Sequence, residues 1–235
     1  MFGYDVSVQK ARSAAFLSRL DAGTALAALG QNIQGIDFSD YVDRAATAGI
    51  DLDGSVALSE RAIGFLSRPH LPDGIPNAPA GPWTALPGEG FSVFSTGLQT
   101  DLLVDNIMDL LNAYAAEKSA TGEATALAKF ADGTLGGGTI VGKGVVAGDG
   151  TALPGKSLFN GLQIFSGGVP LYKNGVLVGA VGVSGDGTEQ DDFVAYAGSA
   201  GFRDFGSVKR SDEVKVNGSV RLPYVKFPRS PFAGL

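Results

Sequence analysis

A β-hairpin sequence in the last third of the chain limits the possible folds more than any other segment. Residues 169–173 and 176–183 (VLVGAVGV) are two runs that favour strands. The dipeptide between them, Asn174-Gly175, is the one that a two-residue type I′ turn prefers, because both positions need a positive φ. Gly179 and Gly182 interrupt the second run, and a glycine inside a strand marks a bulge or the close approach of another backbone or a ligand.

A glycine-rich loop and a helix follow the hairpin. Thr188 is the predicted N-cap of this helix, with Asp191 in the third position of a weak capping box. The first turn is acidic, which the helix dipole favours, and we predict a solvated cluster of Asp186, Glu189, Asp191 and Asp192. The predicted buried face of the helix consists of Phe193, Val194, Ala197 and Ala200.

Other segments predict further helices and extended runs. Residues 5–20 have apolar residues at helical spacing, and Asp37 or Ser39 is suited to cap a short helix that ends near Ala48. Residues 97–118 are also predicted to be mostly helical. Extended structure is predicted for 139–146 within the glycine-rich stretch 133–155, and for the β-prone runs of 214–229, where prolines restrict strands to sheet edges.

The hairpin region carries a resemblance to a known family. The sequence SGGVPLYKNGVLVGAVGVSGDGTEQDD (166–192) is similar to the C-terminal signature of the GlcG/HbpS-type haem-binding family, and DVSVQKARSAAF (5–16) resembles its helical signature. Residues 61–83 and 211–231 look like segments of the longer secreted bacterial members. The resemblance also suggests that the chain is the C-terminal part of such a protein, because an earlier helix and strand of the family have no counterpart in this sequence.

The resemblance implies an α+β fold: an antiparallel sheet with helices packed on its faces, in a profilin-like α/β/α arrangement. Residues 1–20 and 160–205 would form the family core, incomplete on its N-terminal side. Residues 21–159 would be a long insertion, helical and rich in glycine and proline, and 206–235 an extended tail that packs on the core. The missing part of the core would come from another segment or chain, and a homo-oligomer or a partner subunit is expected.

The resemblance further implies a haem or related tetrapyrrole site near the double glycine and the hairpin. Tyr172 is placed to stack on such a ligand or to coordinate its iron. For each glycine the alternative is turn or bulge geometry alone. The residues that match the family motif are Gly167, Gly168, Pro170, Gly182, Ser184 and Gly185.

His70 is the only histidine of the chain. It is chemically suitable as an axial ligand of haem iron. However, it lies in the proline-rich segment 70–91, outside the expected family core, and the alternative is a surface or structural residue. No residue of the sequence is therefore a firm iron ligand.

Composition and motifs exclude several classes of function. The net charge of −6 argues against binding to nucleic acid, and the absence of cysteine excludes thiolate chemistry and disulfides within the chain. No apolar run has the length of a membrane span. A dinucleotide motif would need a third glycine where Gln190 stands, and the spacing of the acidic cluster does not match a calcium loop.

Three hypotheses remain. The first is a non-catalytic haem-binding module, secreted or periplasmic. The second is a structural or assembly subunit of a larger complex without its own ligand. The third, an enzyme of small hydroxy-acid metabolism, ranks last because no acid–base pair or nucleophile is evident in the sequence.

Overall fold

The computed structural model of the chain describes residues 2–28, 37–72, 74–84, 111–132 and 163–226. Helices and three two-stranded sheets alternate along these residues. The protein therefore has the α+β fold that the sequence predicts. The profilin-like detail and the division into a family core and an insertion remain predictions.

The described residues up to position 72 form four helices: α1 (Phe2–Leu17), α2 (Ala22–Ala27), α3 (Phe38–Thr47) and α4 (Glu60–Leu66). The predicted cap of α3 is confirmed, because the Asp37 carboxylate accepts a hydrogen bond from the Ser39 backbone N–H at 2.9 Å. Ser59 caps α4 in the same way, accepting from the backbone N–H of Ala62.

The largest hydrophobic core lies among these helices. Trp83 is fully buried in it, and its indole N–H donates to the carbonyl oxygen of Tyr41 at 3.0 Å. The core joins the C-terminal end of α1 to α2, α3 and α4, and it also receives Val216 and Leu222 from the end of the chain. Burial of this apolar surface is the main stabilising term for this part of the molecule.

The predicted hairpin is confirmed. Strand β2 (Gly168–Lys173) pairs antiparallel with β3 (Val176–Gly182), and the turn residues Asn174 and Gly175 have φ values of 51° and 74°. The register shifts between Leu171, which pairs with Gly179, and Tyr172, which pairs with Leu177. This shift is a β-bulge in β3, as the glycines of that strand led us to expect.

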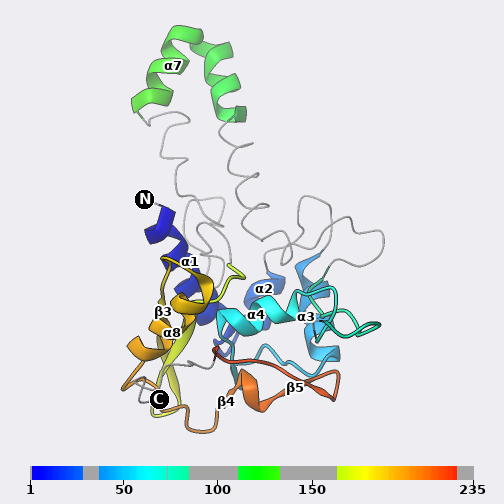
Figure 1. The fold of residues 1–235 in the computed structure, drawn as a ribbon. Coiled ribbons are helices and arrows are strands. Elements are labelled where there is room, and N and C mark those ends of the chain that lie inside the picture. Colours follow the sequence, from blue (N-terminus) through cyan, green and yellow to red (C-terminus); the bar gives the residue numbers. More distant parts are fainter. Residues whose placement is uncertain (1, 29–36, 73, 85–110, 133–162, 227–235) are drawn as a thin grey trace.

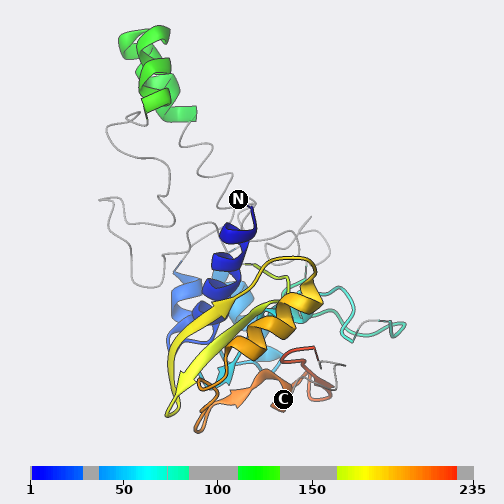
Figure 2. The same ribbon diagram turned by 60° about the vertical axis from the view of Figure 1, so that its left-hand side comes forward.

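The hairpin lies between two helices, α1 and α8 (Thr188–Gly198). Gly182 faces α1, whereas Val181, its neighbour in the strand, packs in a second core with Ala195 of α8. Successive strand residues point to opposite faces, so the two helices cover opposite faces of the hairpin. Figures 1 and 2 show the yellow hairpin between the dark blue α1 and the gold α8.

Helix α8 differs from its prediction in two respects. Its N-cap is Gly187 and not Thr188, and no side chain caps it. Its buried residues are Asp191, Asp192 and Ala195, whereas Val194 is exposed. The prediction of a solvated acidic cluster was therefore wrong for Asp191 and Asp192, because both carboxylates have cationic partners on other helices.

Short strands complete the described structure. Strand β1 (Val56–Ala57) pairs in parallel with β4 (Lys209–Arg210), and a 3₁₀ turn, η2 (Ser211–Glu213), follows β4. Strands β5 (Lys215–Val216) and β6 (Val220–Arg221) form a small antiparallel hairpin around a turn at Asn217 and Gly218, which both have positive φ.

Residues 111–121 are helical and are followed by α7 (Glu123–Asp132), and the two segments are joined by an ion pair of 2.7 Å between Lys129 and Glu117. The helix predicted for 97–118 is present where it overlaps these residues. The extended run predicted for 139–146 lies outside the described residues. Among the helices that the structure describes, none has the length and apolar character needed to cross a lipid bilayer.

Candidate functional site

Two of the predicted site glycines bring α1 into direct contact with the hairpin. A Cβ atom on Gly182 would lie 1.9 Å from the carbonyl oxygen of Ser7, and one on Gly168 would lie 2.6 Å from the carbonyl oxygen of Lys10. No side chain fits at such distances. These contacts are those of close helix–strand packing, which is the backbone approach that the sequence left open for Gly182.

Gly167, the first residue of the double glycine, lies above a buried ion pair. Its φ is +118°, and a Cβ atom there would lie 2.7 Å from Cβ of Asp191 and 3.0 Å from Nζ of Lys10. Lys10 Nζ lies 2.8 Å from Asp191 Oδ2 and donates a second hydrogen bond to the carbonyl oxygen of Val183 at 2.9 Å. The glycine therefore leaves room for a charge contact between α1 and α8.

A second ion pair lies beside the first. Arg61 Nε of α4 lies 2.7 Å from Asp192 Oδ2, and the same oxygen accepts a hydrogen bond from the backbone N–H of Lys226. Burial raises the pKa of the Asp192 carboxyl, and these two donors oppose that effect only in part.

Glu60 lies in the same region but, unlike Asp191 and Asp192, forms no ion pair among the described residues. Its side chain is fully buried, and neither carboxylate oxygen has a hydrogen-bond partner among the described residues. Ser13 and Lys10 lie near enough to favour the charged form, but the Ser13 hydroxyl donates to the carbonyl oxygen of Gln9. Burial therefore dominates and raises the pKa of Glu60 well above its usual range.

The remaining residues of the family motif occupy two different environments. Pro170 is buried in β2, opposite Ala180 of β3. Ser184 is half-buried and Gly185 is exposed, and both belong to the loop that leads into α8. The structure thus brings the motif residues together around one hairpin. Most of them pack the hairpin against its neighbours or belong to the loop that follows it.

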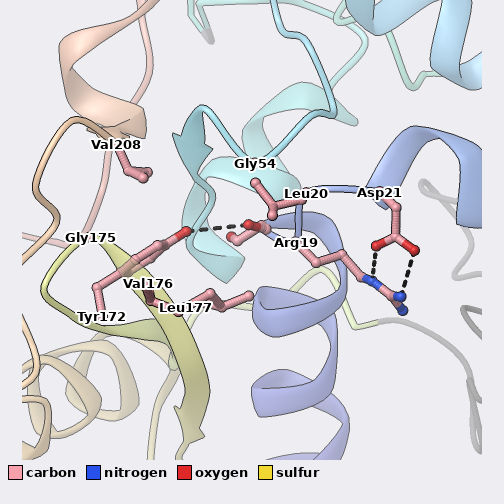
Figure 3. A pocket seen from close by; sticks show the side chains of 10 residues that line it. Arg19, Leu20, Asp21, Gly54, Tyr172, Gly175, Val176, Leu177 and Val208 are labelled. Carbon is pink, nitrogen blue, oxygen red and sulfur yellow. Dashed lines mark hydrogen bonds and ion pairs between the residues drawn. The ribbon is translucent and has the colours of Figure 1, made fainter.

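A pocket of about 340 Å³ opens at the tip of the hairpin, next to the C-terminal end of α1. Its walls are mainly apolar carbon, and Figure 3 shows residues from the segment after α1, from the hairpin and from two other segments around it. Arg19 and Asp21 form a bidentate ion pair at its edge. The pocket is lined by Ser18, Arg19, Leu20, Asp21, Gly54, Tyr172, Gly175, Val176, Leu177 and Val208.

Tyr172 is the predicted ligand-binding residue that lines this pocket. Its hydroxyl donates to the carbonyl oxygen of Ser18 at 3.3 Å (Figure 3), and its ring centroid lies 5.1 Å from that of Phe205. Burial raises the pKa of the phenol to about 12, so the group is neutral at physiological pH. A neutral, hydrogen-bonded phenol favours packing or stacking over coordination of a metal.

His70 is not among the residues that line the pocket. It is exposed in the segment after α4, and its Nδ1 lies 3.5 Å from the carbonyl oxygen of Ala78. Within the part of the chain that the structure describes, no three histidine, cysteine or acidic residues gather in a way that could hold a metal ion.

Sequence reasoning missed several residues of this region. Leu20 and Val176 line the pocket and are 84% and 61% exposed, although large apolar side chains normally avoid water. The sequence carried no signal for Leu20, which follows the end of α1. Val176 was recognised only as a strand residue, because its exposure depends on what the rest of the chain leaves uncovered.

The fold and these contacts define a class of protein: an α+β protein with a glycine-rich hairpin packed between two helices and an apolar pocket at the hairpin tip. Residues 90–200 match the family model described as "Haem degrading protein HbpS-like". The resemblance to the GlcG/HbpS-type family is therefore confirmed, and residues 90–200 are an HbpS-like region. No curated protein and no solved structure matches the chain.

Proposed function

We propose that this protein is a non-catalytic haem-binding module that acts in a secreted or periplasmic setting. The observation that carries the proposal is the match of residues 90–200 to the HbpS-like family, whose description refers to haem. This match includes both strands of the hairpin and all the motif residues around it. The resemblance of residues 61–83 and 211–231 to longer secreted members supports the location.

The chemistry of the hairpin region agrees with this proposal in one respect. The pocket beside Tyr172 has mainly apolar walls, which suit the faces and edges of a tetrapyrrole. The pocket volume of about 340 Å³ is at the lower end of the range for small-molecule sites. The pocket would therefore enclose only part of the surface of a tetrapyrrole.

The test is a titration of the purified chain with haemin, followed by the Soret band. We expect saturable binding with a Kd in the micromolar range or below. His70→Ala serves as the variant that removes the only histidine, and unchanged binding by this variant would move the site to the hairpin. The absence of saturable binding by the wild-type chain would contradict the proposal.

A second measurement separates binding from turnover. The complex with haemin is incubated with ascorbate in air, and the Soret band and released iron are followed over time. A non-catalytic module leaves haem intact, or degrades it no faster than the reagent alone does. Faster loss would instead support the activity named in the family description.

One observation favours the alternative of an assembly subunit. Among the described residues, β3 pairs only with β2, so no described strand covers its other edge, which is suited to pairing with another chain. Val176 and Val178 of this strand are both exposed. Sedimentation velocity tests this alternative: an oligomer that forms without any bound pigment would support it, and a monomer would argue against it.

A further inference from the structure

The pocket at the hairpin tip combines two features that point to an apolar ligand. Leu20 comes from the segment after α1 and Val176 from the start of β3, and both large side chains remain mostly in water. Two exposed apolar side chains beside one apolar hollow mark a surface that gains free energy when it is covered. The only charged residues among those that line the pocket, Arg19 and Asp21, neutralise each other.

The walls of the pocket offer few groups that bind haem iron. The chain has one histidine and no cysteine, and the histidine, His70, does not line the pocket. Tyr172 does line it, but its hydroxyl already donates to the carbonyl oxygen of Ser18. Coordination through oxygen would require the phenol to lose its proton, which its burial opposes. An attraction based on iron therefore finds no suitable partner in the walls of this pocket.

These observations extend the proposed haem-binding function, on which the following inference rests. We propose that the pocket is the tetrapyrrole site, that Leu20 and Val176 hold the macrocycle by apolar contact, and that the pocket residues give its iron no ligand. The pocket then recognises the apolar surface of the ligand, which is the same with and without the metal. Metal-free protoporphyrin IX is expected to bind as tightly as haemin.

The experiment compares haemin and protoporphyrin IX on the full chain. Binding is followed by absorbance for haemin and by porphyrin fluorescence for the metal-free ligand, with wild type, Leu20→Asp and Val176→Asp. The matched control is Val178→Asp, because Val178 belongs to the same strand, is 54% exposed and does not line the pocket. Thermal unfolding of each variant checks that these surface substitutions leave the fold intact.

We expect the two ligands to have Kd values within about threefold of each other in the wild type. Leu20→Asp and Val176→Asp should each weaken both ligands about tenfold or more, because a carboxylate replaces an apolar contact. Val178→Asp should change either Kd by less than about threefold. Tyr172→Phe and His70→Ala should leave the ratio of the two Kd values unchanged.

The possible failures are distinct. If the wild type binds neither ligand, the haem-binding function itself is overturned. If it binds both, but Leu20→Asp and Val176→Asp behave like Val178→Asp, the function survives and the pocket assignment is overturned. If haemin binds much more tightly than protoporphyrin IX, and Tyr172→Phe or His70→Ala removes the difference, iron coordination replaces apolar contact as the basis of recognition.

Discussion

The ammonium group of Lys10 on α1 lies 2.8 Å from the carboxylate of Asp191 on α8, with side chains that are only 2% and 6% exposed. The two residues are 181 positions apart in the chain. The same ammonium group binds the carbonyl oxygen of Val183, just after β3. One buried cation therefore connects both helices with the hairpin that lies between them.

Replacing Lys10 with methionine should destabilise the protein by about 3–5 kcal/mol, because Asp191 is left as a buried charge without its partner. Urea unfolding followed by circular dichroism measures this loss. The control is the double variant Lys10→Met with Asp191→Leu, which removes both charges and should be more stable than the single variant. Equal stability of the wild type and Lys10→Met would show that the pair contributes little.

Glu60 should make the stability depend on pH. Because its pKa is raised in the folded state, the folded protein retains a proton that the unfolded chain releases above about pH 4.3. The contribution of Glu60 to the free energy of unfolding should therefore fall as the pH rises from that value. The fall ends once the pH exceeds the pKa of Glu60 in the folded protein. Glu60→Gln cannot ionise, so the difference between wild type and variant should change in this window. Parallel stability curves from pH 4 to pH 8 would contradict the prediction.

Gly182 should not tolerate even one added methyl group. In Gly182→Ala the new Cβ would lie 1.9 Å from the carbonyl oxygen of Ser7, so α1 must move away from the hairpin. We expect a loss of at least about 1–3 kcal/mol in urea unfolding. The control is Gly198→Ala in α8, where nothing lies within 4 Å of the new Cβ and alanine should be neutral or stabilise the helix.

Tyr172 should titrate late. Its phenol pKa of about 12 predicts that this residue changes the tyrosinate absorbance only near that pH. In Tyr172→Phe the part of the titration near pH 12 should therefore become smaller, and the part near pH 10 should stay the same. Since an unfolded tyrosine ionises near pH 10, the wild type should lose stability relative to Tyr172→Phe between about pH 10 and pH 12. At neutral pH the variant loses the hydrogen bond to Ser18, at a cost of about 1 kcal/mol. A variant that alters the early phase of the titration would contradict the burial of this phenol.

The predictions from sequence were most successful where neighbouring residues decide the conformation. The Asn174-Gly175 turn has the two positive φ values that its type requires, and Asp37 caps α3 as expected. Both features depend on contacts within a few residues, so the local sequence is sufficient to predict them. The family resemblance was recognised from the same hairpin sequence and is confirmed by the family model.

The burial of Asp191 and Asp192 in α8 depends instead on contacts with distant segments of the chain. By local rules Asp191 and Asp192 belong in a solvated first helical turn, yet the structure buries both. Their partners, Lys10 and Arg61, come from helices far away in the sequence. No periodicity within α8 could reveal cations that reach it only after the chain has folded.

The amino-acid pattern was sufficient to predict the hairpin, its turn, helices α1, α3 and α8, and the resemblance to the HbpS-like family. The folded arrangement was needed to show which side the signature glycines face, that Gly168 and Gly182 pack against α1, and that Leu20 and Val176 line one pocket. The two groups of features differ in the range of the interactions that produce them. Turns and caps are set by neighbours in the chain, whereas burial, ion pairing and pockets are set by segments that only the fold brings together.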